Sequence, residues 1–238
     1  MVDAEEAVAH EAAHDHGATA ALFVGLTVSG LAMEVHGSSR PASGADHQIA
    51  HLWEMEDVHH GGERVSHGAC VAIGCLDALS LYDWLIEQDF SELDTDAIVA
   101  AAPSLDDKRR EIRARFTDAA IAERAEAETA AKHLDPSDHR DRIAVIRKAW
   151  PALRSRLADH LPRTAAMRAK LEAAGAPTSA RAIGIDAIHH RCTIEAARLL
   201  RARYTILDLL EEMGHLRPAL DALFAGAGHA AGAGPATR

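Results

Sequence analysis

Three histidines stand close together in the sequence, with an acid beside them, at spacings that suit a metal site. His47 and His51 are four residues apart, Glu54 follows three residues later, and His67 comes after a short polar segment. If residues 47–54 form a helix, these two histidines and the glutamate share one face. A pair of histidines one helical turn apart can hold a divalent metal from one side. The sequence therefore predicts a metal site near His47.

The helix that carries His47 is predicted to start at Ser43, because Ser43-Gly-Ala-Asp46 fits the capping pattern of a serine followed three residues later by an acid. His47 then lies in the first turn, where exposed N–H groups and the positive end of the helix dipole disfavour a charged imidazolium. A neutral ring keeps a nitrogen for a metal. The spacing by itself is weak evidence, since the chain has 16 histidines and His10 and His14 share it.

His67 lies at the start of the next predicted helix, between Ser66 and Gly68. Ser66 is a candidate cap for that helix, and Gly68 leaves room for another group to approach. A single histidine in such a position is more often a structural side chain than a metal ligand. The prediction that His67 is a ligand therefore depends on its neighbours.

The loop before the first of these helices is rich in hydrogen-bond donors. Ser38, Ser39 and Arg40 offer two hydroxyls and a guanidinium just ahead of a helix N-terminus, a combination that can bind a phosphate group. The alternative is a hydrogen-bonded loop with an exposed arginine. On these residues alone the alternative is favoured, because most exposed arginines bind nothing specific.

The elements around these residues are expected to be helical throughout. The chain of 238 residues is 48% hydrophobic and 26% charged, is rich in alanine, and has no convincing strand alternation. We predict an all-α fold, with one metal- and substrate-binding domain over 1–224 and a disordered tail over 225–238. The predicted helices span 4–35 (with a break near Gly30), 45–55, 68–88, 106–133, 138–159 (with a kink or break at Pro151), 162–174, 179–190 and 195–213.

Charge and cysteine content limit the partners and the compartment. The formal net charge of −11 argues against nucleic acid or an anionic membrane as the main partner. Cys70, Cys75 and Cys192 show no paired spacing, which is typical of reduced cysteines in the cytoplasm. The uncharged run Gly17–Met33 is shorter than the ~20 residues of a membrane-spanning helix, so we expect a buried helix of a soluble, cytoplasmic protein.

These segments resemble the C-terminal helical domain of the sn-glycerol-1-phosphate dehydrogenases, in the iron-containing alcohol dehydrogenase superfamily. The likeness runs in order through most of the chain, and a chance match to the loop and the histidines together is very improbable. The matching segments are Ser29–Met33, Gly37–His47, His51–Glu54, Ser66–Gly68, and Arg201–Leu209 with Gly214.

The resemblance implies an N-terminal α/β domain that binds NAD(H) or NADP(H), and a divalent metal, commonly zinc, held by one aspartate and two histidines. The two histidines correspond to His47 and His67. The resemblance further implies a small phosphorylated substrate, for which His51 and the loop residues Ser38, Ser39 and Arg40 are the candidate contacts. The implied reaction is the reversible reduction of dihydroxyacetone phosphate to sn-glycerol 1-phosphate, a step of ether phospholipid biosynthesis.

In the family, the cofactor domain and the metal-binding aspartate lie upstream of the segment that matches Met1. We therefore predict that two histidines alone hold zinc weakly and that the isolated chain has little or no dehydrogenase activity. No residue of the chain is predicted to act as a catalytic acid or base. A homo-oligomer, or a partner chain that supplies the cofactor domain, is expected. The alternatives are a non-catalytic interaction or scaffold protein derived from the family, and a fragment of a related polyol dehydrogenase.

Overall fold

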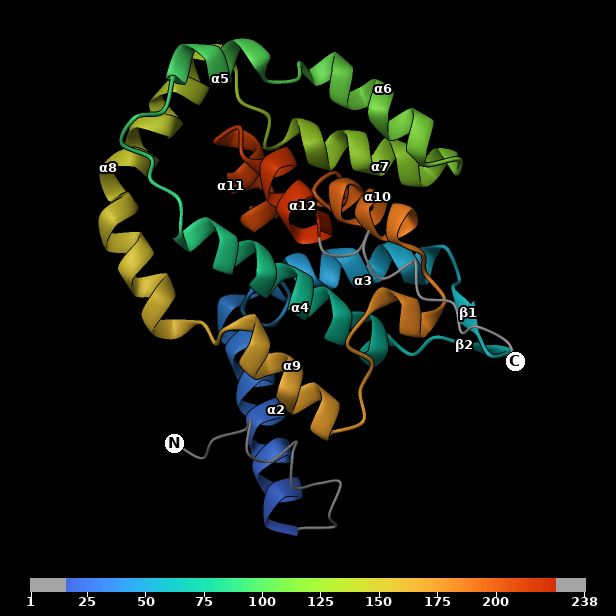
Figure 1. Ribbon diagram of the computed structural model, residues 1–238. Coiled ribbons are helices and arrows are strands. Elements are labelled where there is room, and N and C mark those ends of the chain that lie inside the picture. Colours follow the sequence, from blue (N-terminus) through green and yellow to red (C-terminus); the bar gives the residue numbers. More distant parts are fainter. Residues whose placement is uncertain (1–15, 226–238) are drawn as a thin grey trace, which may run out of the picture. The chain divides into compact units, whose positions relative to one another are not determined.

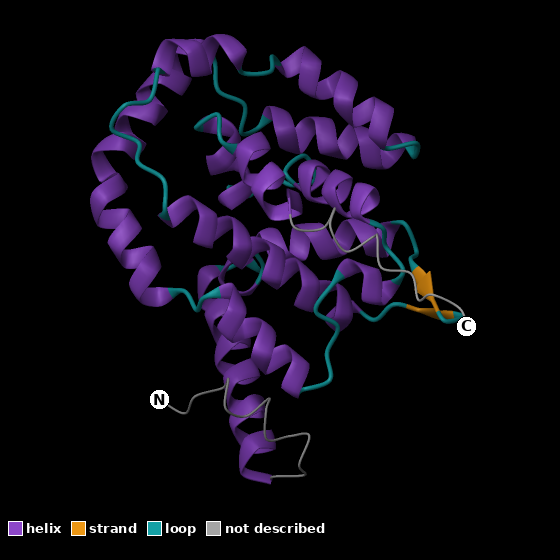
Figure 2. Ribbon diagram, viewed as in Figure 1, coloured by secondary structure: helices purple, strands orange, loops and turns teal. Residues whose placement is uncertain are grey.

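The computed structural model describes residues 16–225 and confirms the all-α prediction (Figures 1 and 2). Within that range the strands are limited to one short antiparallel hairpin, β1 (His59–His60) and β2 (Glu63–Arg64). Gly61 and Gly62 turn this hairpin with φ angles of 62° and 88°, which glycine adopts at low cost. Most of the predicted tail, residues 226–238, lies outside the described residues.

The contacts divide the chain into two compact units. The described part of the first unit is residues 16–79 and 162–185, and that of the second is 80–161 and 186–225. The helices of the first unit are α2 (His16–His36), η1 (Arg40–Ala42), α3 (Ala45–Met55), the first part of α4 (His67–Ile86), α9 (Thr164–Ala173) and η2 (Ala180–Ile183). All the residues of the predicted metal and substrate sites lie in this first unit.

Helix α2 differs from the prediction in two ways. It continues through Gly30 without a break, and the expectation of a buried helix is wrong, because Ala18 is its one buried residue and Phe23 is 71% exposed. By length and composition, α2 and α4 are each apolar enough to cross a membrane. For α4, 56% of the apolar stretch is buried, as in the core helix of a globular protein, whereas for α2 the share is 6%. Length and composition are weak evidence for a membrane span.

The second unit contains the end of α4 and a set of further helices. In two places, a pair of these helices replaces one longer predicted helix. Its elements are α5 (Thr95–Ala101), α6 (Leu105–Arg115), α7 (Ala119–Ala130), α8 (Pro136–His160), α10 (Ala187–Ala197), α11 (Ile206–Glu212) and α12 (Leu216–Ala225). The predicted helix 106–133 is wrong, because Asp118 accepts hydrogen bonds from the N–H groups of Ala120 and Ile121 and so starts a second helix. The helix predicted at 138–159 runs through Pro151 unbroken.

Two further predicted helices are also divided. The helix at 179–190 is interrupted at Gly184, which has a φ of 83° at the end of η2. The helix at 195–213 is wrong, since α10 ends at Ala197 and α11 begins after Thr205, which forms a capping box with Asp208. The predicted stop at Gly214 is confirmed by its φ of 72°.

A buried cluster of ion pairs holds α6, α11 and the segment between α10 and α11 together. We call it the Arg198 cluster; its residues are Lys108, Glu111, Arg198 and Glu211. The Arg198 side chain is 8% exposed and binds Glu111 with Nη2–Oε2 at 2.7 Å and Glu211 with Nε–Oε1 at 2.6 Å. Lys108 pairs with the other oxygen of Glu211. The buried charge of Arg198 is therefore matched by two carboxylates, of which Glu211 is 16% and Glu111 33% exposed.

Candidate metal centre

Helix α3 has the bounds that the sequence predicts and carries His47 and His51 on one side. Its N-cap is Gly44, so the prediction of Ser43 is wrong by one residue. Asp46 nevertheless serves this helix start, because its Oδ1 accepts a hydrogen bond of 2.8 Å from the N–H of Gly44. His47 thus lies in the first turn of α3, as expected.

Helix α4 starts at His67 and approaches the start of α3 closely. Ser66 caps it as predicted, with its Oγ accepting a hydrogen bond of 3.2 Å from the N–H of Ala69. Two turns into α4, Gly74 packs against the backbone of Asp46: a Cβ at this position would lie 3.1 Å from the Asp46 carbonyl carbon and still closer to its oxygen. The absent side chain of Gly74 lets the helix that starts at His67 lie against the first turn that carries His47.

Replacing Gly74 with alanine is expected to destabilise the protein by about 1–3 kcal/mol, because the added methyl group must push the two backbones apart. Urea unfolding followed by circular dichroism measures the change. Gly68→Ala is the matched control, since it lies in the same helix and its Cβ would meet nothing within 4 Å. The control should be neutral or stabilising by up to ~1 kcal/mol. Equal effects of the two substitutions would refute the close-approach argument.

The three histidines form one cluster. The ring centroids of His47 and His67 are 5.5 Å apart, those of His51 and His67 are 5.8 Å apart, and those of His47 and His51 are 6.2 Å apart. His47 and His51 are partly buried, whereas the side chain of His67 is 53% exposed. Residues that are up to 20 positions apart in the chain are thus brought to one place by the packing of α3 against α4.

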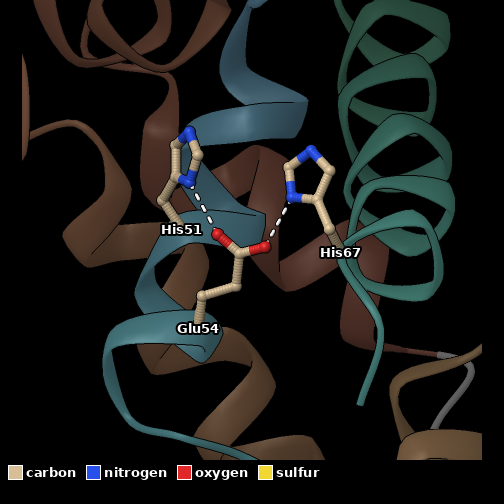
Figure 3. A group of neighbouring side chains, drawn as sticks. All are labelled: His51, Glu54 and His67. Atoms are coloured by element: carbon tan, nitrogen blue, oxygen red, sulfur yellow. Dashed lines mark hydrogen bonds and ion pairs between the residues drawn. The ribbon is translucent and has the colours of Figure 1, made fainter. Parts of the chain in front are cut away.

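Each of the three rings is held by a carboxylate at Nδ1. Glu54 uses both of its oxygens: Oε2 lies 2.8 Å from Nδ1 of His51 and Oε1 lies 2.5 Å from Nδ1 of His67. Figure 3 shows this carboxylate between the two rings, with the other nitrogen of each ring directed away from it. Asp46 Oδ2 lies 2.7 Å from Nδ1 of His47.

These contacts define how the rings are protonated. Burial raises the pKa of Glu54, but the hydrogen bonds from His51 and His67 outweigh it and hold that pKa below its ordinary value. Burial likewise raises the pKa of Asp46, but the hydrogen bonds from His47 and Gly44 and the charge of His47 together outweigh it and lower that pKa. An ionised carboxylate only accepts hydrogen bonds, so each Nδ1 carries the hydrogen. In a neutral ring the lone pair is then on Nε2.

The donors present fit a divalent metal such as zinc. Imidazole nitrogens with a carboxylate at the opposite ring nitrogen are the usual protein ligands of this ion. One grouping of possible ligand atoms consists of His51, Glu54 and His67, whose nearest nitrogen and oxygen atoms lie within 4.8 Å of one another. Burial raises the pKa of the Cys70 thiol, in the next turn of α4, to about 11, so without a metal it is protonated at neutral pH.

The predicted phosphate loop lies directly before α3 and is exposed. The Oγ of Ser38 accepts a hydrogen bond of 3.3 Å from the N–H of Arg40 and lies 2.9 Å from Nδ1 of His36. None of the hydrogen bonds described for Ser38 and Arg40 involves the three clustered histidines. The substrate-binding roles of Ser38, Ser39 and Arg40 therefore stay predictions, as do the ligand roles of His47 and His67.

Sequence reasoning noticed Glu54 and Asp46 without giving either one a place in the site. The signal for Glu54 was its spacing of three residues from His51, which places it within reach on the same helix face. Its contact with His67, 13 positions away, required the packing of two helices. Asp46 had been assigned to the helix start alone, although its second oxygen binds His47.

The segment Arg201–Leu209, which also carries the resemblance, has a structural role in the second unit. Asp208 accepts a hydrogen bond of 2.8 Å from the N–H of Thr205 and pairs with Lys132 at 2.5 Å. In this segment, the residues that match the family cap the start of α11 and pair it with Lys132. It adds no ligand to the metal cluster.

Comparison with known proteins gives one consistent result. The chain is 29% identical over 193 residues to the glycerol-1-phosphate dehydrogenase (NAD(P)+) of Geobacillus stearothermophilus, covering 81% of this chain and 38% of that protein. It is 46% identical over 57 residues to the enzyme of the same name from Halalkalibacterium halodurans, covering 24% of this chain and 14% of that protein. A third relative of that name, from Korarchaeum cryptofilum, is 35% identical over 86 residues, covering 36% of this chain and 26% of that protein.

The chain spans well under half the length of these curated relatives, and the match lies in their C-terminal region. No family model matches the chain, and no solved structure matches it significantly. The order of the matching segments, the helical fold and the histidine cluster agree with this likeness. The chain is similar to the C-terminal region of glycerol-1-phosphate dehydrogenases.

Proposed function

We propose that this chain is the metal- and substrate-binding part of an NAD(P)-dependent glycerol-1-phosphate dehydrogenase. The observation that carries the proposal is the clustering of His47, His51 and His67, each with a carboxylate at Nδ1, within a chain whose relatives bear that name. A scaffold protein has no physical need for three clustered imidazoles that are each held by a carboxylate. The proposal places the protein in lipid metabolism, in the cytoplasm.

The reaction of the complete enzyme is the reduction of the ketone of dihydroxyacetone phosphate by NAD(P)H and one proton, which gives sn-glycerol 1-phosphate and NAD(P)+. A divalent metal bound at the cluster supplies Lewis-acid polarisation of the ketone oxygen, and the nicotinamide supplies the hydride. In this chain, His47 and His67 hold the metal, while Asp46 and Glu54 fix the orientation of their rings. The cofactor is bound mainly by another part of the enzyme.

The test is a chimera that joins this chain to the remaining part of the Geobacillus stearothermophilus relative. The zinc-loaded chimera is expected to oxidise NADH or NADPH when dihydroxyacetone phosphate is added, and His47→Ala and His67→Ala should each abolish turnover. The chain without that part should give none. A folded, metal-loaded chimera with no turnover would refute the proposal. Turnover with glycerol or another unphosphorylated polyol, and none with the phosphate ester, would support a related polyol dehydrogenase instead.

The loop ahead of α3 is proposed to bind the substrate phosphate, with Arg40 as its charged member and Ser38 and Ser39 as hydroxyl donors. In the chimera, Arg40→Ala should raise KM for dihydroxyacetone phosphate by about 10–150-fold, since a charge-assisted hydrogen bond contributes ~1.5–3 kcal/mol. Zinc content should not change. Arg181→Ala is the matched control, because Arg181 is an exposed arginine of η2 in the same unit. Equal losses of substrate and zinc binding in Arg40→Ala would contradict the phosphate role.

A further inference from the structure

We infer that an exposed apolar stripe on α2 is the surface on which the rest of the dehydrogenase packs, namely the part that corresponds to the N-terminal remainder of the curated relatives. The stripe consists of Val24, Val28, Leu31 and Val35. The inference rests on the proposed function, because it names the partner that a metal- and substrate-binding part needs. It applies whether that partner is joined to this chain or belongs to another one.

The stripe is a contiguous apolar surface along one line of the helix. Its four residues follow the spacing i, i+4, i+7 and i+11, which places them one above the other. Each of them is more than half exposed, and Val35 is 90% exposed. Within α2, the first residue with a charged carboxylate, ammonium or guanidinium group is Glu34. A large, uncharged and exposed patch of this kind marks an interaction surface.

The opposite side of α2 is already covered. Ala18 is buried, and Leu22, Gly25 and Ser29, which share its side of the helix, are partly buried. The end of α2 contacts η1. Lipid would have to surround a membrane-spanning helix, and the uncharged run of residues 17–33 is shorter than the ~20 residues of a span. The stripe therefore fits a protein surface better than a bilayer.

The length of the relatives indicates which protein surface covers the stripe. The match covers 38% of the Geobacillus stearothermophilus enzyme and lies in its C-terminal region, so most of that enzyme lies ahead of the match. Helix α2 is the first described helix, drawn in blue in Figure 1, and it contains Ser29–Met33, the first of the matching segments. The part of the enzyme ahead of the match therefore adjoins α2.

The stripe also leads directly to the candidate site. Gly37, with a φ of 69°, follows the end of α2, and the N–H of Ser38 donates a hydrogen bond of 3.2 Å to the carbonyl of Met33. Val35, the last residue of the stripe, is thus followed at once by the loop that is proposed to bind phosphate. A domain on the stripe would lie beside that loop, where a nucleotide-binding part must lie to bring its nicotinamide to the substrate.

The experiment compares the double variant Val28→Gln, Leu31→Gln in two proteins: the full chain alone, and its chimera with the remaining part of the Geobacillus stearothermophilus relative. Glutamine is a good helix former, so the change mainly removes apolar surface. The urea midpoint of the chain alone should not change, because both side chains are exposed there. The midpoint of the chimera should fall by about 1 M or more, since two large side chains lose their burial. Ile188→Gln, at an exposed position of α10, should change neither midpoint.

Thiol labelling tests the same surface if the double variant of the chimera fails to fold. The cysteine of Leu31→Cys should react with a bulky, polar maleimide at least ~10-fold more slowly in the chimera than in the chain alone, because labelling then requires local opening. Mass spectrometry of the labelled peptide gives the rate. The cysteine of Ile188→Cys should react equally fast in both proteins.

Equal labelling of Leu31→Cys in the two proteins would overturn the inference, as would a loss of stability when the two glutamines are placed in the chain alone. A dimer of the chimera that the glutamines dissociate would assign the stripe to a second copy. Flotation of the chimera with phosphatidylcholine vesicles, abolished by the glutamines, would assign it to lipid; either result would overturn the inference. None of these measurements needs turnover, so a chimera with a protected stripe that does not reduce dihydroxyacetone phosphate would refute the proposed function alone.

Discussion

Replacing Arg198 with methionine is expected to lower the free energy of unfolding by about 3–5 kcal/mol, because the buried guanidinium is lost and two partly buried carboxylates keep too few partners. Glu111 would lose both of its hydrogen bonds to the guanidinium, and Glu211 would keep Lys108 alone. Urea unfolding at pH 7, followed by circular dichroism, measures the loss. Adding Glu111→Gln to the methionine variant should recover part of it, since one uncompensated charge is removed.

Arg113→Met is the matched control for this prediction. Arg113, also in α6, binds Glu126 of α7 through two hydrogen bonds, of 2.6 and 3.1 Å, but its side chain is 70% exposed. Because water and salt screen an exposed ion pair, this substitution should lower the free energy of unfolding much less than Arg198→Met does. Similar losses in the two variants would show that burial of the Arg198 cluster is not what makes it stabilising.

The Arg198 cluster also predicts how stability depends on pH. Although burial raises the pKa of Glu211, Arg198 and Lys108 lower it from 4.5 to about 2. A depressed pKa means that the folded state binds the proton less tightly than the unfolded state, so the contribution is complete above pH 4.5 and is lost as the pH falls towards 2. The destabilisation by Arg198→Met should therefore shrink over that interval. A constant difference between pH 7 and pH 2.5 would contradict this account.

Replacing Glu54 with glutamine is expected to weaken zinc binding by about 10–100-fold, because both His51 and His67 lose the carboxylate that orients them. Glutamine has the same shape, but it offers one acceptor oxygen to two Nδ1–H donors, and its NH2 group faces the second ring. Competition with a chromophoric chelator measures the affinity. The Co2+ spectrum of the loaded variant should match that of the unaltered chain, since the histidine ligands remain.

Glu63→Gln, in the exposed strand β2 of the same unit, is the control and should leave zinc affinity unchanged. Two results would contradict the role given to Glu54. An unchanged zinc affinity in Glu54→Gln would show that the carboxylate does not position the rings. An altered Co2+ spectrum would indicate that Glu54 binds the metal directly.

Local sequence patterns predicted the fold class and the elements whose ends are marked by strong signals. The bounds 45–55 agree with α3, and Ser66 and Gly214 cap and end helices as expected, because capping and left-handed turns depend on a few neighbouring residues. The same local reasoning joined α6 to α7 and α10 to α11. The segment 106–133 was predicted as one helix because it is strongly charged, and 195–213 because its apolar residues keep helical spacing. Asp118 and Thr205 each start a new helix inside these segments.

The burial of elements could not be predicted in this way. The run Gly17–Met33 is apolar enough for a core helix, yet α2 exposes most of it. Conversely, the chain around Arg198 looked like an ordinary amphipathic helix, whereas the guanidinium is buried among carboxylates from distant segments. Which surface is covered depends on contacts between segments far apart in the sequence, and hydrophobic periodicity does not contain that information.

The sequence by itself determined the all-α fold, the helix that carries His47 and His51, and the likeness to glycerol-1-phosphate dehydrogenases, because these depend on local spacing and on the order of short segments. Only the tertiary structure decided that His67 joins the other two rings and that Glu54 holds two of them at once. The physical reason is the close approach of α4 to α3, which Gly74 permits by having no side chain against the backbone of Asp46. A contact of that kind joins residues that no sequence pattern relates.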